Sequence, residues 1–243
     1  PDGGHNTSVC THGHAEHAFR QLEESIEKMK KGERQNIVIG TGHGTCTCQG
    51  AAFEYLFNVN YLIRKHGVRD KADITWITNE MELGDFGMGG MHIKRGGYVT
   101  HSRVFTESLF TESAISWIKQ AGVKGIAENK FVYETLDGKE AEQEFDFAMM
   151  LPPFTGVPLQ AFSKSGEEIT DEIFAPNGFM KVDADYSGKP YEDWSPIDWP
   201  ETYQNPTYSN IYAVGIAFAP PHAISKPAKS TNGTPISPTP PRT

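Results

Sequence analysis

A strand, a glycine-rich loop and a helix follow one another between Asn36 and His66, and this order constrains the fold more than any other feature of the sequence. The run from Asn36 to Gly40 is apolar and β-branched, which is typical of a buried strand. From Ala51 onward apolar residues recur at helical spacing, and Gly67 ends the predicted helix. A second buried run, Ile74 to Thr78, completes a βαβ unit, whose functional loop is expected at the carboxyl end of the first strand.

The loop between this strand and helix carries two cysteines, Cys46 and Cys48, among several glycines. Gly42 and Gly44 are candidates for cofactor binding, because glycine lets the backbone approach a ligand closely. The spacing does not match the dinucleotide fingerprint, since a threonine stands where either register needs its third glycine. A helix start just after the cysteines favours the reactive thiolate, whereas inert buried thiols are the alternative. The stretch therefore predicts a redox cysteine on a nucleotide-type fold.

The composition narrows the classes of function. A chain of 243 residues suits one large or two ordinary domains, and its net charge of −9 without a basic run argues against nucleic-acid binding. No apolar stretch approaches the ~18 residues of a membrane helix. Its three cysteines do not make a secreted disulfide framework. The chain opens at Pro1 without a signal peptide or an initiator methionine, so we expect a processed product or an excised fragment.

The sequence predicts a charged helix over Ala15–Lys31. One cysteine and three histidines are clustered around its start: Cys10, His12, His14 and His17. Such a cluster invites a zinc interpretation, with Cys46 or Cys48 completing the ligand set. Solvated or helix-capping histidines are the alternative, because the usual two paired ligand sets are missing.

After the βαβ unit, the glycine-rich stretch 79–90 predicts a ligand-facing loop at another strand end. Glu80 stands where a ribose-binding acid would stand in a nucleotide domain, and a surface carboxylate is the alternative. The pattern then predicts a helix over 98–112 and strands over 115–118, 123–127, 130–135 and 144–151, with a hairpin at Asp137-Gly138.

The composition changes at 151–158, where prolines interrupt the pattern. Beyond it the sequence predicts strands over 178–185 and 210–219, separated by an irregular loop over 186–206 that is rich in Pro, Trp and Tyr. From Pro220 onward Pro, Ser, Thr and Lys dominate, as in a flexible linker.

Three segments carry a resemblance to a known family: Ser8-Val-Cys-Thr with His14-Ala-Glu, then Cys48-Gln-Gly-Ala-Ala-Phe-Glu-Tyr55, then Asn210-Ile-Tyr-Ala-Val-Gly-Ile-Ala with Pro220-Pro. Together they resemble the sulfide:quinone oxidoreductases, flavoproteins of the two-dinucleotide-binding-domain superfamily related to glutathione reductase. The similarity runs through nearly the whole chain, including Lys65-His-Gly-Val-Arg-Asp-Lys71, Ile74-Thr-Trp-Ile-Thr78 and Met149-Met-Leu-Pro-Pro-Phe-Thr-Gly-Val-Pro158. The strand at 210–215 alone is shared with the wider superfamily.

The resemblance implies an FAD enzyme that oxidises sulfide to polysulfide or sulfur and passes electrons to a membrane quinone. Cys48 matches the first flavin-side cysteine, and Cys46 is its rival by a one-residue insertion. Cys10 matches a more distant cysteine, and His14 the histidine that follows it. The remaining matches concern the cofactor: Gly215 and Ile216 lie beside the flavin, and Pro152, Pro153 and Phe154 form the crossover into the FAD domain.

Several family features have no match in this sequence. The second flavin-side cysteine is expected beyond Thr243, and neither the N-terminal FAD fingerprint nor the C-terminal amphipathic helices are found. Asp85 occupies the place of a histidine in the glycine-rich loop, and Asp is a weaker proton shuttle near neutral pH unless its pKa is raised. We therefore expect a middle piece that binds FAD weakly or not at all and is inactive alone.

The implied fold is α/β, with a Rossmann-like three-layer second domain (βαβ with a β-meander) flanked by partial FAD-binding domain of the glutathione reductase type. The expected parts are residues 1–33, the end of the first FAD-domain segment; 34–147, the second domain; and 148–243, the incomplete second FAD-domain segment. The parent is expected at the cell membrane, in peripheral contact through segments missing here, while the fragment is expected to be soluble.

Two other functions stay open. The first is the flavin subunit of a sulfide dehydrogenase that passes electrons to cytochrome c. The second is a non-catalytic Cys/His metal-binding or nucleotide-binding module. The sequence also leaves open a homo-oligomer and the choice between Cys46 and Cys48 as the working thiol.

Overall fold

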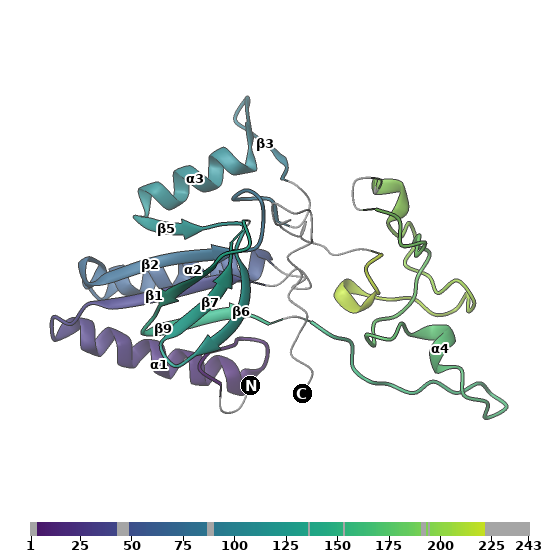
Figure 1. The fold of residues 1–243 in the computed structure, drawn as a ribbon. Helices are drawn as coiled ribbons and strands as arrows, with labels where there is room; N and C mark the ends of the chain where they lie inside the picture. The colour runs from purple at the N-terminus through teal and green to yellow at the C-terminus, as the bar shows by residue number, and fades with distance from the viewer. Residues whose placement is uncertain are drawn as a thin grey trace. The chain divides into compact units, whose positions relative to one another are not determined.

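The computed structural model describes residues 4–42, 49–86, 90–135, 137–152, 154–190, 193 and 195–221 (Figure 1). The chain forms two compact units, and the division between them falls between residues 153 and 154. We call the N-terminal one unit 1 and the C-terminal one unit 2, and each is described by itself.

A four-stranded parallel sheet forms the centre of unit 1, in the order β5-β2-β1-β9 (Figure 1). Its strands are β1 (Gln35–Thr41), β2 (Ala72–Thr78), β5 (Ile115–Ile118) and β9 (Phe147–Leu151). Three helices accompany it: α1 (His12–Lys30), α2 (Gln49–Lys65) and α3 (Ser102–Glu112). Strand β1, helix α2 and strand β2 form the predicted βαβ unit, since β1 and β2 pair in parallel.

A three-stranded antiparallel meander covers one face of this sheet, with strands β6 (Gly122–Ala127), β7 (Lys130–Glu134) and β8 (Glu140–Glu144). Phe131 and Phe145 of the meander side form one buried cluster with Val38, Ile77 and Met150 of the parallel sheet. Side chains alternate along a strand, so the neighbours of Val38 point to the opposite face, where α1 and α2 pack against β1. The predicted α/β fold with a parallel sheet and a β-meander in three layers is confirmed.

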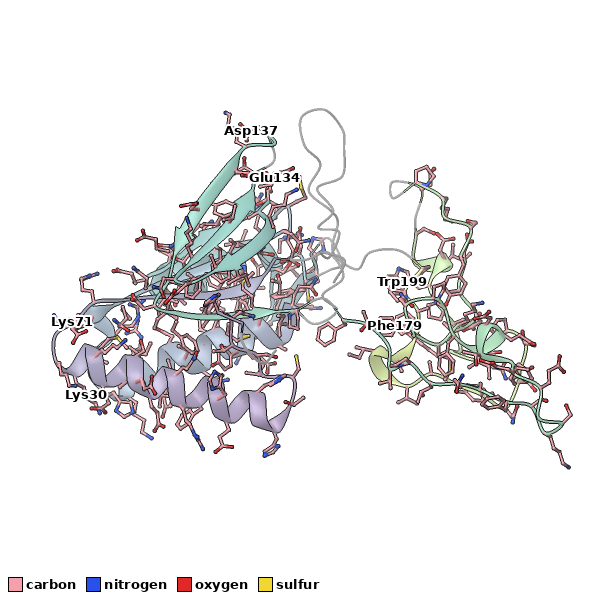
Figure 2. The ribbon with its side chains drawn as sticks, turned by 60° about the horizontal axis from the view of Figure 1, so that its bottom comes forward. Lys30, Lys71, Glu134, Asp137, Phe179 and Trp199 are labelled. Carbon is pink, nitrogen blue, oxygen red and sulfur yellow. The ribbon has the colours of Figure 1, made fainter. Side chains whose placement is uncertain are left out.

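The turn between β7 and β8 lies where the sequence predicts a hairpin. Gly138 has φ of 78°, a conformation that favours glycine, and Asp137 lies at the tip of the hairpin (Figure 2). The pairing from Lys130↔Glu144 to Glu134↔Glu140 confirms the Asp137-Gly138 hairpin.

Two predicted elements of unit 1 are divided in the structure. The helix predicted over 98–112 begins only at Ser102, because Gly96 and Gly97 both have positive φ and turn β4 (Tyr98–His101) back onto β3 (His92–Arg95). The strand predicted over 144–151 is two strands, β8 and β9. The backbone N–H of Phe145 donates to Asn129 and that of Asp146 to Asn36, so the chain passes there from the meander to the parallel sheet.

Unit 2 contains little regular structure among its described residues: helix α4 (Thr170–Ile173) and short 3₁₀ turns at Pro196–Asp198 and Gly215–Ala217. The prediction of strands over 178–185 and 210–219 is wrong. Isolated bridges at Met180 and Tyr212 replace them. The alternating apolar residues of the second segment, such as Val214, are exposed, and this segment joins no sheet among the described residues of the unit.

A contact between two backbones holds the start of unit 2 against its middle. A Cβ on Gly156 would lie 1.9 Å from the carbonyl oxygen of Gly178, so the two glycines allow an approach that no other residue permits. Trp199, Tyr203 and Phe218 form a further aromatic group in the same unit, with ring centroids 5.3–5.8 Å apart for the two pairs that include Phe218.

The predicted boundary between residues 147 and 148 falls inside β9, whose last residue is Leu151. Strand β9 pairs with β1 and remains in unit 1, while the compact division follows at 153 and 154. The assignment of residues 1–33 and 148–243 to an FAD domain stays a prediction. None of the helices that the structure describes is long and apolar enough to span a bilayer.

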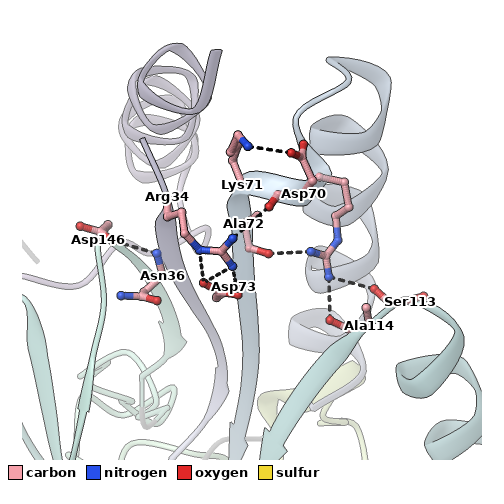
Figure 3. Close-up of polar contacts among 10 residues, drawn as sticks. Arg34, Asn36, Asp70, Lys71, Ala72, Asp73, Ser113, Ala114 and Asp146 are labelled. Carbon is pink, nitrogen blue, oxygen red and sulfur yellow. Dashed lines mark hydrogen bonds and ion pairs between the residues drawn. The ribbon is translucent and has the colours of Figure 1, made fainter. Parts of the chain in front are cut away.

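Arg69 joins α2, β2 and the end of α3 through its hydrogen bonds. Three of the residues that accept them, Ala72, Ser113 and Ala114, are labelled in Figure 3. The guanidinium of Arg69 donates to Asn60 Oδ1 (2.9 Å) and to the carbonyl oxygens of Ala72 (2.6 Å), Ser113 (2.9 Å) and Ala114 (2.7 Å). The guanidinium is partly buried, and this burial lowers the pKa of Arg69. The planar fork of arginine suits this arrangement better than the single ammonium of lysine.

We expect Arg69→Ala to lower the free energy of unfolding by roughly 2–3 kcal/mol, because several carbonyl acceptors lose a charged donor at once. Arg69→Lys should recover only part of this loss. Urea denaturation followed by tryptophan fluorescence measures it. The control is Arg34→Ala, which removes an exposed pair with Asp73 (2.7 Å) and should cost much less. Equal losses in the two alanine variants would contradict the role given to Arg69.

Candidate functional site

The carboxyl ends of the parallel strands meet at one edge of unit 1. Thr41 ends β1 and stands in register with Thr78, the end of β2, and with Leu151, the end of β9. Beyond β9, Thr7 pairs in parallel with Met149 and donates its backbone N–H to Ala148. Ligands of open α/β sheets bind outside the carboxyl ends of strands, so we take this carboxyl edge as the candidate site.

The sheet brings several predicted residues to the carboxyl edge. Gly42 follows β1, Pro152 follows β9, and Cys10 lies three residues beyond Thr7, which runs parallel to β9. Four predicted residues lie outside the described part of the chain: Gly44, Cys46, Cys48 and Pro153. In sequence, the two cysteines stand between Gly42 and Gln49, the first residue of α2.

A chain of buried polar groups links the ends of β1 and β2. Thr41 Oγ1 and Thr78 Oγ1 are 3.1 Å apart, and both residues are fully buried. Thr78 Oγ1 also donates to Glu80 Oε2 (3.3 Å) and accepts from the backbone N–H of Glu80 (3.2 Å). Buried polar groups are costly unless they are paired, so these contacts fix the first residues of the loop that leaves β2.

Glu80 is only 3% exposed, so it is not the surface carboxylate that the sequence offered as one alternative. The neighbouring Asn79 is also buried, and its Oδ1 has no hydrogen-bond partner among the described residues. Its backbone N–H donates to the carbonyl oxygen of Thr41 (3.0 Å). Sequence reasoning missed the threonine pair, although Thr41 directly follows the first predicted strand and Thr78 ends the second.

The glycines at the end of β1 have packing roles. A Cβ on Gly40 would lie 1.9 Å from the carbonyl oxygen of Ile77, and one on Gly42 would lie 2.3 Å from the side chain of Val123. Side chains at these positions would push β1 away from β2 and from the meander. Packing therefore accounts for Gly42, and its role in cofactor binding stays a prediction.

Asp85 lies in the loop that leaves β2 and is half-buried. Its Oδ2 accepts from the backbone N–H of Glu82 (3.1 Å), and its carbonyl oxygen accepts from the N–H of Gly90 (3.1 Å). Burial is the main cause that raises the pKa of Asp85, the negative charge of Glu82 raises it further, and the charge of His101 opposes the rise. A raised pKa brings this carboxyl closer to the proton-shuttle role predicted for it.

An aromatic cluster holds the residue after Asp85. Phe86 has a positive φ of 49°, and its ring lies 5.4 Å from that of Phe53 on α2. Phe53 in turn stacks 5.8 Å from the fully buried Phe110 of α3, which contacts Trp76 on β2. The unusual backbone at Phe86 is therefore held by packing, and the loop carrying Asp85 is attached to α2, α3 and β2.

Cys10 and His14 lie at the start of α1. Cys10 is exposed, and Thr11 caps the helix by accepting from the backbone N–H of His14 (3.3 Å). The Nδ1 of His14 is buried and has no hydrogen-bond partner in the described part of the chain. Within that part, no three His, Cys, Asp or Glu side chains gather as metal ligands. The zinc interpretation needs Cys46 or Cys48 and lies outside what the structure describes.

The other cofactor candidates belong to unit 2. Gly215 has φ of 63°, and a Cβ built on it would meet nothing within 4 Å. Ile216 follows in the same 3₁₀ turn and is exposed, while Phe154, the first residue of the unit, is half-buried. This turn presents open backbone and an apolar side chain, a surface that can take a flat apolar ring.

Comparisons with known proteins agree with this architecture. No protein-family model matches the chain. A protein of Aquifex aeolicus (strain VF5) described as sulfide-quinone reductase is 32% identical over 216 residues, which are 89% of this chain. The X-ray structure of the sulfide:quinone oxidoreductase from Aquifex aeolicus superposes with a TM-score of 0.64 at 30% identity, over 90% of this chain. The chain is a relative of sulfide-quinone reductase.

This relationship confirms the resemblance found in the sequence and identifies the relatives as oxidoreductases. The chain spans 42% of the length of the curated relative and 42% of the chain in the solved structure. The activity, substrates and partners of a whole sulfide-quinone reductase are therefore proposals for this chain. The roles of Cys10, His14 and Asp85 also stay predictions.

We expect Thr78→Val to lower the free energy of unfolding by about 1–2 kcal/mol, because the buried hydroxyl of Thr41 and the N–H of Glu80 would lose their partner. Thr78→Ser keeps the hydroxyl and serves as the matched control. Urea denaturation of the two variants measures the difference. A valine variant as stable as the serine variant would show that the hydroxyl chain does not stabilise this edge.

We expect Asp85→Asn to stabilise the fold at neutral pH. The raised pKa means that the folded state disfavours the carboxylate, so stability is lost as the pH rises from the ordinary carboxyl range through the raised pKa. Asparagine does not ionise and still accepts from Glu82. Thermal melting should therefore show a higher Tm than wild type at about pH 7 and a smaller difference at about pH 3. A difference that grows toward acid would refute the assignment.

Proposed function

We propose that this chain supplies the core of a flavoprotein that oxidises sulfide and passes electrons through FAD to quinone. The observation that carries the proposal is the similarity to sulfide-quinone reductase over 89% of the chain, including the segment that holds Cys46 and Cys48. The arrangement of strand ends at the carboxyl edge supports it, since both cysteines follow the end of β1.

The proposed reaction converts hydrosulfide, one proton and quinone into sulfur at the zero oxidation level and quinol. FAD supplies the two-electron acceptor when it is bound. The role of the protein is to present a thiolate that exchanges with a disulfide or persulfide sulfur. Cys48 directly precedes α2 in sequence, and a helix N-terminus favours the thiolate, so we assign it as the working thiol, with Cys46 as its rival.

Three further residues receive roles in the proposal. Cys10 is the distant thiol that assists sulfur transfer, and its exposure leaves it accessible to a soluble sulfur species. His14 and Asp85 are the proton-transfer groups. The raised pKa of Asp85 supports that role, because a proton is retained closer to neutral pH.

Within unit 2, the open turn at Gly215 and Ile216 suits close approach of a ring. On the sequence resemblance alone, we assign Pro152, Pro153 and Phe154 to the crossover into the FAD domain. We propose residues 34–147 as the second domain, with 1–33 and 148–243 as segments of the FAD domain. With the chain spanning 42% of its relative, we expect weak or no FAD binding by these 243 residues alone.

The test is the visible absorption spectrum of the flavoprotein that contains this chain, before and after sulfide is added under argon. We expect flavin bands at about 375 and 450 nm that bleach with sulfide. Cys48→Ser should abolish a long-wavelength thiolate–flavin band and reduce turnover at least about a hundredfold, because the nucleophile is lost.

Cys46→Ser is the matched control, since it removes a thiol from the same loop and should keep the long-wavelength band. The reverse pattern would make Cys46 the working thiol. Bleaching with transfer to cytochrome c and none to quinone would identify a sulfide dehydrogenase instead. A colourless protein that does not take up FAD would refute the flavoenzyme and leave a binding module, for which stoichiometric zinc is the direct measurement.

A further inference from the structure

The ribbon of β3 and β4 extends from the start of α3 (Figure 1). It exposes apolar side chains. Tyr98 is 82% exposed and Val99 is 62% exposed. On the adjoining first turn of α3, Val104 and Phe105 are also exposed. Large apolar side chains gathered on one projecting element mark an interaction surface more often than scattered single residues do.

The charge of the ribbon differs in sign from that of the protein. The chain has a net charge of −9, yet the segment between Phe86 and Glu107 contains no Asp or Glu. Lys94 and Arg95 are exposed at the turn and form no ion pair with any residue that the structure describes. Such a local basic charge on an acidic protein fits an anionic partner.

Strand pairing mixes the two kinds of side chain. Lys94 lies directly opposite Val99, and Arg95 lies directly opposite Tyr98. Each apolar side chain therefore has a cation beside it across the ribbon, about 5 Å away at the level of Cβ. Aromatic residues with neighbouring lysine or arginine are the combination found at the boundary between lipid headgroups and acyl chains.

Ser102 holds the base of the ribbon. Its hydroxyl donates to the carbonyl oxygen of Gly84 (2.7 Å) and accepts from the backbone N–H of Met91 (2.9 Å), and its own N–H donates to Met91 (2.8 Å). Ser102 is fully buried. The ribbon is therefore fixed where it leaves the domain, and little ordering of the chain is needed when its tip binds.

We propose that the β3–β4 ribbon docks on the surface of a bilayer that contains anionic phospholipid, with Tyr98 and Val99 in the headgroup region and Lys94 and Arg95 on the phosphates. Each strand of the ribbon has four residues and is about 13 Å long. A ribbon this short presents less surface than the about 800 Å² per partner that a stable protein interface buries, but it is long enough for interfacial anchoring. The inference deepens the proposed function, which needs access to a membrane quinone, and it places the contact on residues of this chain.

The test is co-sedimentation of the 243-residue chain with quinone-free vesicles, so it does not depend on the reaction. We expect binding to phosphatidylcholine–phosphatidylglycerol vesicles and much weaker binding to phosphatidylcholine alone. Lys94→Gln with Arg95→Gln should weaken binding at least about tenfold, and Tyr98→Ser about fivefold. Added salt should weaken the binding of wild type more than that of the Lys94/Arg95 variant.

Matched controls use exposed residues of α2 and the C-cap residue of α1. Tyr61→Ser removes another exposed tyrosine, and Lys31→Gln with Lys65→Gln removes two other exposed cations, so both should bind as wild type does. Circular dichroism confirms that each variant is folded. Equal losses in the controls, or no binding to either vesicle, would overturn the proposal. Sedimentation showing an oligomer that Tyr98→Ser dissociates would overturn it too and assign the ribbon to a second copy of this chain.

Discussion

The backbone register of three parallel strands determines where everything else in unit 1 can lie. Because β1 pairs with both β2 and β9 and all three end at the same level, the loops after Thr41, Thr78 and Leu151 leave the sheet side by side. The N-terminal segment joins the same edge through Thr7. Backbone hydrogen bonds between parallel strands thus bring four distant parts of the sequence to the same edge of the sheet. This arrangement does not depend on side-chain contacts.

Polar contacts then give this edge its particular character. The threonine pair and buried Glu80 fix the loop after β2, and the aromatic contacts of Phe86 hold the loop that carries Asp85. Both are side-chain contacts, outside the backbone ladder of the sheet. They limit the positions that the loop can adopt, as a catalytic site requires when its groups must keep their geometry.

The local sequence pattern was sufficient to predict elements whose signal lies within one continuous segment. The βαβ unit, the meander and the Asp137-Gly138 hairpin could be predicted because each has a strong periodic or turn signal. The pattern failed where partners decide the outcome. Tyr98–His101 is a strand because two glycines turn it back onto β3. The apolar run over 210–219 pairs with no sheet in the part of unit 2 that the structure describes. At the candidate site, the ends of the strands could be predicted from the sequence. The contact between the Thr41 and Thr78 hydroxyls could not, because it depends on the register of β1 against β2.

The absence of room at Gly40 has a practical consequence for any mutational survey of this chain. A side chain there would collide with the backbone of β2, so every substitution should reduce the amount of folded protein whatever the chemistry of the neighbouring cysteines. Intolerance at this position therefore reports on the distance between two strands. Surveys that rank residues by loss of activity need a parallel measurement of abundance before Gly40 is counted among the residues that meet a substrate.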